Sequence, residues 1–195
     1  MLKGKASSAL NTKLLLAMGM HEALCLYGLE YVIDPTTPFT EFSQKKDAVD
    51  FLQFPRRTLS YKSGDCDDLT ILYAAMLEAV GIPAAFVTTP GHIFTAFALG
   101  MNEDEARRTF SSTADLIYRG GDTWVPVETT LLDRGFVQAW SDGARQWRDA
   151  SAQKTASLIP VRDAWAVYEP TWFGSSEQDA IIRTFPSTQT VASRT

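Results

Sequence analysis

One stretch of this sequence constrains the fold more than any other, an apolar run over residues 69–80 that follows the polar segment 63–68. Its large apolar side chains recur at the i, i+3, i+4 and i+7 spacing of one helical face, at Leu69, Leu72, Tyr73, Met76, Leu77 and Val80. The run therefore predicts a buried helix that packs against other elements along its whole length.

Both ends of this predicted helix carry end signals. Asp65 is a suitable N-cap, and Asp68 lies three residues later, where it can support the first N–H groups. Gly81 and then Pro83 follow the run, which is typical of a helix C-terminus. We therefore assign Gly64, Asp65 and Asp68 to the capping and support of a helix whose first residue is Cys66.

Cys66 lies where a helix can activate a thiol. The aligned peptide dipoles and the N–H groups of a first turn favour an anion and lower a thiol pKa. The carboxylates of Asp65, Asp67 and Asp68 act in the opposite direction, because they disfavour another negative charge nearby. An activated Cys66 therefore needs a cationic partner.

Length and composition favour one domain. The chain has 195 residues, 45% of them hydrophobic, which is enough for one sizeable core. We expect a single domain over residues 1–175, with its core at 45–130, and a partly disordered tail at 176–195. The tail reads as linker sequence, consistent with one domain of a longer chain. The net charge is −5, with only short basic pairs, so nucleic acid is a poor partner.

The cysteines and the N-terminus bear on the compartment. Cys25 and Cys66 are the two cysteines and lie in separate helical stretches, so they do not form a disulfide framework. The apolar run at 14–20 is short and is interrupted by His21, which makes it an unconvincing signal peptide. No segment reaches the roughly 18 to 20 apolar residues of a membrane span. We expect a soluble protein without a membrane span, cytoplasmic by default.

The rest of the sequence predicts helices around two β-hairpins. Helical patterns mark residues 10–27, 47–52 and 136–147, and 101–112 is a surface helix or an insertion. β-prone runs around turn residues mark hairpins at 84–99 and 116–128, with Pro126 at an edge or a bulge. Loops or polar connectors are expected at 34–46, 56–62 and 149–158, and a last ordered segment at 164–170. The prediction is an α+β fold in which the Cys66 helix packs on an antiparallel sheet made of the two hairpins.

Three residues of an activated nucleophile occur in the order Cys66, His92, Glu128. Cys66 begins a helix, His92 begins a strand after a Pro-Gly turn, and Glu128 ends a strand, so they can supply a thiolate, a base and a group that orients the base. We expect a low-pKa thiolate at Cys66, paired with an imidazolium at His92. A metal site is the other interpretation, but one thiolate and one imidazole are too few for a closed zinc site, so we expect no metal or cofactor.

At these residues the sequence resembles the transglutaminase-like superfamily, whose members share a papain-like core. The resemblance covers about residues 45–130, and its motifs are Gly64-Asp65-Cys66-Asp67-Asp68 with Ala79-Val80-Gly81-Ile82-Pro83-Ala84, then Gly91-His92-Ile93-Phe94, then Trp124-Val125-Pro126-Val127-Glu128-Thr129-Thr130. It implies that Cys66 is the nucleophile, His92 the base and Glu128 the orienting acid, although the family more often has aspartate at the last position. After Thr130 the chain is more loosely similar to bacterial members.

The expected function is acyl transfer through a thioester on Cys66, with hydrolysis of an amide, peptide or isopeptide bond in a protein or peptide substrate as the expected reaction. Two alternatives stay open: an inert binding or scaffold module, and amine transfer that crosslinks glutamine. Candidates for the oxyanion or substrate contacts are the Cys66 N–H and the side chains of Ser60, Tyr61 and Trp124. Substrate specificity is expected in the loops at 34–46 and 100–115.

Overall fold

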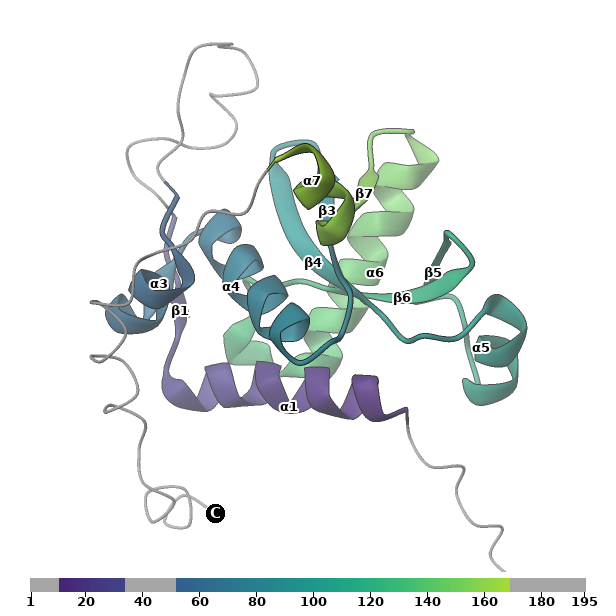
Figure 1. The fold of residues 1–195 in the computed structure, drawn as a ribbon, viewed down its shortest axis with the longest axis horizontal. Helices are drawn as coiled ribbons and strands as arrows, with labels where there is room; N and C mark the ends of the chain where they lie inside the picture. Colours follow the sequence, from purple (N-terminus) through teal and green to yellow (C-terminus); the bar gives the residue numbers. More distant parts are fainter. Residues whose placement is uncertain (1–10, 34–51, 169–195) are drawn as a thin grey trace, which may run out of the picture.

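The computed structural model describes residues 11–33 and 52–168 and has an α+β fold, which confirms the predicted class. Within these ranges the centre is a five-stranded antiparallel sheet with the strand order β5-β6-β4-β3-β7 (Figure 1). The strands are β3 (Ala84–Thr89), β4 (His92–Ala98), β5 (Ile117–Arg119), β6 (Asp122–Val127) and β7 (Ser157–Pro160). The loop predicted at 34–46, the helix predicted at 47–52 except for its last residue, and the tail predicted at 176–195 lie outside the described residues.

The two predicted hairpins form most of this sheet, and their register sets the place of the site. β3 and β4 pair antiparallel, with Thr89 opposite His92 at the turn. β4 also pairs with β6, with Thr95 opposite Val127. The beginning of β4 and the end of β6 therefore lie at the same end of the sheet. β6 continues past the end of β5, so Pro126 lies where the strand has only β4 beside it and its missing N–H is tolerated.

The central helix α4 (Cys66–Ala79) packs against β4 and β3 as predicted. Asp65 is its N-cap and accepts hydrogen bonds from the N–H groups of Asp67 and Asp68, both at 3.0 Å. Asp68 in turn accepts one from the Asp65 N–H at 3.4 Å, which completes a capping box. Val80 is 48% exposed, contrary to its predicted place on the buried face, because the helix has already ended at Ala79.

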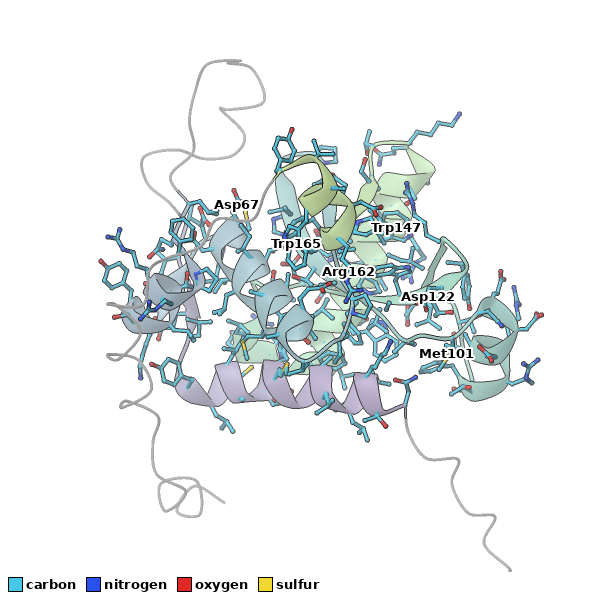
Figure 2. The ribbon with its side chains drawn as sticks, in the orientation of Figure 1. Asp67, Met101, Asp122, Trp147, Arg162 and Trp165 are labelled. Carbon is cyan, nitrogen blue, oxygen red and sulfur yellow. The ribbon has the colours of Figure 1, made fainter. Side chains whose placement is uncertain are left out.

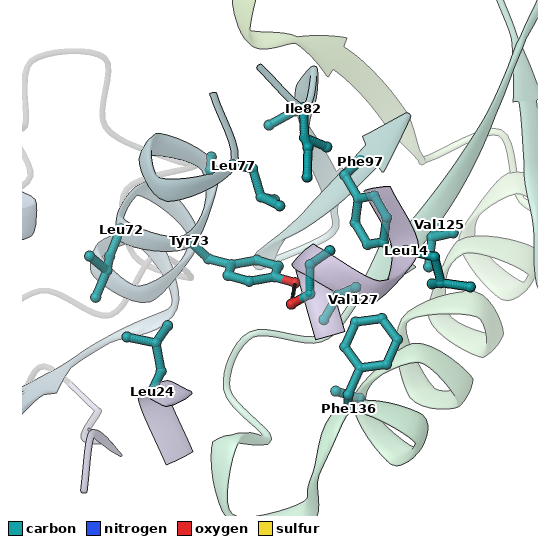
Figure 3. Packing of buried hydrophobic residues seen from close by; sticks show 14 of the residues in the cluster. Leu14, Leu24, Leu72, Tyr73, Leu77, Ile82, Phe97, Val125, Val127 and Phe136 are labelled. Carbon is teal, nitrogen blue, oxygen red and sulfur yellow. Dashed lines mark hydrogen bonds between the residues drawn. The ribbon is translucent and has the colours of Figure 1, made fainter. Parts of the chain in front are cut away.

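The main core lies between α4, one face of the sheet and α1 (Thr12–Tyr27). Asn11 caps the start of α1 and Gly28, with φ +81°, ends it. Figure 3 shows Tyr73 and Leu77 of α4 on one side of this core, facing Phe97 of β4 and Phe136 on the other side. The buried Tyr73 hydroxyl donates to the Ala17 carbonyl at 2.8 Å, so its polar end is satisfied inside the core.

Helix α6 (Phe136–Ala152) contributes to both faces of the sheet. Phe136 and Ala139 belong to the main core, whereas Trp147 packs against a second cluster that contains Phe94, Trp124 and Leu158 among other residues. Trp147 lies far from α1 in this arrangement (Figures 1 and 2). Phe136 and Trp147 of this helix therefore serve packing, each in a different core cluster.

Short elements complete the fold. β1 (Glu30–Tyr31) and β2 (Ser63–Gly64) form a separate parallel pair, and α5 (Glu103–Thr109) is the predicted surface helix. A 3-10 helix, η1 (Leu132–Arg134), precedes α6.

Among the described residues no helix is long and apolar enough to cross a membrane. Cys25 and Cys66 are both free thiols.

Two of the predicted loops contain regular structure. The loop predicted at 56–62 is mostly helix, α3 (Pro55–Tyr61), because Pro55 lies at the first helical turn, where its missing N–H is not needed. The connector predicted at 149–158 contains the end of α6 and the start of β7, which pairs with β3 at the edge of the sheet. β7 leads into α7 (Val161–Val167), where the last ordered segment was predicted.

The alternating burial of β7 gives a direct test of this edge strand. Leu158→Ala should lower the free energy of unfolding by about 2–5 kcal/mol, because the side chain is 2% exposed and its loss leaves a cavity. Ile159→Ala is the matched control, since Ile159 is 41% exposed, and should cost about 1 kcal/mol or less. Urea denaturation measures both, and the reverse ranking would mean that β7 is shifted by one residue.

Candidate active site

Cys66 is the first residue of α4 and lies beside the beginning of β4. Its thiol donates to Asp67 Oδ1 at 3.4 Å, and the backbone N–H of Ile93 hydrogen-bonds the sulfur. Figure 2 shows Asp67 at this end of α4. Cys66 is 9% exposed, so its side chain is nearly buried. It lies next to Ile93, the residue that follows His92.

The surroundings of Cys66 oppose ionisation. Burial raises the pKa of the thiol to about 12, with further contributions from the charge and hydrogen bond of Asp67 and the charge of Asp65, while the Ile93 N–H lowers it slightly. The thiol is therefore protonated at neutral pH. This contradicts the predicted low-pKa thiolate, because burial and the carboxylates of Asp67 and Asp65 outweigh the favourable end of the helix.

His92 and Glu128 form a hydrogen-bonded pair. His92 Nε2 lies 2.7 Å from Glu128 Oε2, and the side chain of Glu128 is 3% exposed against 23% for His92. An ionised carboxylate only accepts hydrogen bonds, so Nε2 carries the proton of this contact. The other ring nitrogen, Nδ1, is then the one that can accept a proton.

The carboxylate of Glu128 accepts two hydrogen bonds on each oxygen from described residues. Oε2 accepts from His92 Nε2 and from Gln146 Nε2, and Oε1 accepts from the N–H and the hydroxyl of Thr130. Burial by itself would raise the pKa of Glu128, but the bonds from His92 and Thr130 outweigh it and lower the pKa overall. Glu128 is therefore negative at neutral pH, with its charge hydrogen-bonded rather than exposed.

Three buried threonines connect the elements beneath these residues. Thr70, one turn after Cys66, lies 2.9 Å from the hydroxyl of Thr129, which follows Glu128. The Thr70 hydroxyl also donates to the Ile93 carbonyl at 3.3 Å, and the Thr95 hydroxyl donates to the Thr70 carbonyl at 3.2 Å. These bonds hold α4, β4 and the end of β6 in one arrangement.

Gly64 and Asp68 pack together just before and at the first turn of α4. A side chain at Gly64 would place its Cβ 2.7 Å from Asp68 Cβ and 3.1 Å from the Thr58 methyl carbon, so only glycine fits. Asp68 also accepts from the Gln53 N–H at 2.7 Å and from its side-chain amide at 2.6 Å. Asp68, which was predicted to support the start of the helix, therefore also holds Gln53 in the segment before α3.

Tyr31 is a site residue that sequence reasoning missed. β1 pairs with β2 so that Tyr31 is opposite Gly64, two residues before Cys66. Burial raises the pKa of the Tyr31 phenol, and so do the charges of Cys66, Asp65, Glu128 and Asp67, which lie around the same space. Nothing in the sequence signals a two-residue parallel pairing between segments so far apart in the chain.

The other candidate contacts are either far from the site or exposed. Trp124 is opposite Ala98, at the far end of β4, which puts it roughly 20 Å along the strand from His92. Its indole N–H donates to the Arg119 carbonyl within its own hairpin, so Trp124 is a packing residue and not an oxyanion contact. Ser60 and Tyr61 are exposed near the end of α3. No group of three or more His, Cys, Asp and Glu side chains among the described residues could hold a metal ion.

Comparison with known proteins identifies the family. The family model of the transglutaminase-like superfamily matches residues 29–129, more than half of the chain. The chain belongs to the transglutaminase-like superfamily. No curated protein and no solved structure matches it. The matched segment of this superfamily member contains Tyr31, Cys66, His92 and Glu128, whereas α6 follows it.

The role of Asp67 can be tested through the reactivity of Cys66. Asp67→Asn should lower the pKa of the thiol and speed its alkylation by iodoacetamide at about pH 8 by up to about tenfold, since one pKa unit is a tenfold change in thiolate. In the wild-type protein the rate should rise about tenfold per pH unit throughout the neutral range. Peptide mapping by mass spectrometry measures each cysteine separately.

Two controls belong to this experiment. Cys25 should keep its slow rate, because burial and Glu22 raise its pKa to about 11. Asp104→Asn, on the exposed surface of α5, should change neither rate. If Cys66 in the Asp67→Asn variant reacts no faster than in the wild type, Asp67 does not set its pKa.

Proposed function

We propose that this protein is a cysteine hydrolase with a papain-like core that cleaves an amide, peptide or isopeptide bond through a thioester on Cys66. The observation that carries the proposal is the 2.7 Å bond between His92 and Glu128 next to the first turn of α4. It supports His92 as the general base and Glu128 as the residue that orients it. The superfamily includes cysteine acyl-transfer enzymes, which agrees with this chemistry.

Because the resting thiol is protonated, proton transfer accompanies the attack. His92 Nδ1 takes the proton of the Cys66 thiol while the sulfur forms a bond to the carbonyl carbon of the substrate. The tetrahedral intermediate collapses as the leaving amine takes that proton from Nδ1, and the C–N bond breaks to give the thioester. Water then attacks with His92 again as base, which releases the acid and restores the thiol.

Two donors can stabilise the oxyanion. The Asp65 carboxylate accepts the N–H groups of Asp67 and Asp68, and the Cys66 N–H at the first helical position is not among those it takes. Tyr31 adds a phenol that is protonated at neutral pH, because an ordinary tyrosine has a pKa of about 10 and the surroundings of Tyr31 raise it further. We propose the Cys66 N–H and the Tyr31 hydroxyl as the oxyanion contacts, in place of Ser60 and Tyr61.

Exposure favours water over an amine as the second nucleophile. The His92 side chain is 23% exposed, so water reaches the base that must activate it. Preference for an amine over concentrated water requires a site that excludes solvent. Hydrolysis is therefore proposed ahead of crosslinking. One observation favours the alternative of an inert binding or scaffold module, namely the raised pKa of the Cys66 thiol.

A trapping experiment separates the three functions. Cys66 should be acylated by an activated acyl ester or a glutamine donor peptide, and in millimolar primary amine the released product should be mostly free acid. Mass spectrometry of the protein and the products measures both steps, with Cys66→Ala as the blank. Predominant amine adduct would establish crosslinking, and no acylation of Cys66 by any donor would favour the inert module.

The proposed oxyanion contact has a matched pair of variants. Tyr31→Phe removes only the hydroxyl and should lower kcat on the order of a hundredfold, the usual effect of one lost oxyanion donor. Tyr61→Phe removes the same group from a side chain that is 64% exposed and should leave kcat unchanged. If kcat falls only in the Tyr61→Phe variant, the oxyanion contact is Tyr61 of α3 and not Tyr31.

A further inference from the structure

We propose that Gln146 of α6 is a positioning residue that holds the Glu128 carboxylate against His92. The role assigned here rests on the proposed function, because it concerns the residue that orients the base. Gln146 and the rest of α6 lie beyond the segment matched to the superfamily.

The contact is made to the oxygen that holds the histidine. Gln146 Nε2 donates to Glu128 Oε2 at 2.5 Å, and His92 Nε2 is bonded to this same oxygen at 2.7 Å. Thr130 supplies both donors to the other oxygen. Gln146 therefore fixes the side of the carboxylate on which the orientation of His92 depends.

The backbone of α6 is built to approach Glu128 closely. The Ala139 carbonyl accepts the Glu128 N–H at 2.9 Å, so the helix holds the main chain of Glu128 as well as its side chain. At Gly143, a Cβ would lie 3.0 Å from the Pro126 carbonyl and 3.1 Å from the Glu128 nitrogen. Ala139, Gly143 and Gln146 follow one another at i, i+4 and i+7 on a single helical face. Small residues at the first two positions let the third reach the carboxylate.

The chemistry of an amide suits this task. Glutamate has more rotatable bonds than a shorter acid, so a buried glutamate needs several contacts to keep one orientation. A lysine or arginine at position 146 would neutralise Glu128 and weaken its attraction for a protonated His92. The neutral amide of Gln146 restrains the carboxylate and leaves its charge for the histidine.

The first test reads the His92–Glu128 bond directly and needs no substrate. Proton NMR of the protein labelled with 15N-histidine should show the His92 Nε2–H downfield and slow to exchange with water. Gln146→Met removes the donor at similar volume, and should shift this proton upfield and speed its exchange at least several-fold. Since the chain has two histidines, the fully buried His21 serves as the internal reference.

The second test measures turnover and a double-mutant cycle. Gln146→Met should lower kcat about tenfold with KM unchanged, because the amide bonds a charged group and not the substrate. In a Glu128→Gln background the same change should cost less than about twofold, since the carboxylate that Gln146 holds is gone. Gln138→Met is the matched control: its amide bonds Asp142 on the exposed face of the same helix, and it should leave the NMR signal and kcat unchanged.

The outcomes separate this proposal from the proposed function. An unchanged His92 proton in Gln146→Met, or a full additive loss in the Glu128→Gln background, would overturn the positioning role. If no donor is turned over by the wild type, the proposed function fails, but the NMR comparison still decides whether Gln146 holds Glu128. Should Gln146→Met fold poorly in a thermal melt, Gln146→Ala is measured by the same NMR comparison with the same two results.

Discussion

The buried charge of Glu128 is the constraint on which the rest of the site depends. A carboxylate that is only 2% exposed is tolerated in its charged form when its oxygens are hydrogen-bonded. Its donors come from β4, from the turn after β6 and from α6, through His92, Thr130 and Gln146. The register of β4 on β6 and the docking of α6 on β6 must therefore both be right before the charge is satisfied.

The start of α4 serves two purposes that oppose each other. The capping box of Asp65 and Asp68 stabilises the first turn, typically by about 1 kcal/mol for the N-cap alone. The charges of Asp65 and Asp67 also raise the pKa of Cys66. A neutral thiol beside a histidine held by Glu128 is the consequence. If Cys66 is the nucleophile that we propose, its activation then depends on transfer of its proton during the attack on a bound substrate.

Local signals explain which parts of the fold the sequence predicted. The ends of α4, the turns of the two hairpins and the periodicity of α1 depend on neighbouring residues, and all were predicted. The loop predicted at 56–62 was wrong because proline occurs after the end of one helix as well as at the first turn of another, as Pro55 does in α3. β7 has a single buried residue, Leu158, between the exposed Ser157 and Ile159, and gains strand structure only from β3. The contacts of Tyr31 and Gln146 join distant segments, so no pattern along the chain could indicate them.

The position of α6 links the site to the far side of the sheet. Gln146 reaches Glu128 because Gly143 lets the helix touch β6, and the next residue, Trp147, packs against the cluster that contains Leu158 of β7. The carboxylate is thus held by a helix that packs on α4's side of the sheet through Phe136 and on the opposite face through Trp147. The segment matched to the superfamily ends at residue 129, before any of these contacts. In this chain the structural unit that forms the site must therefore extend through α6 to β7.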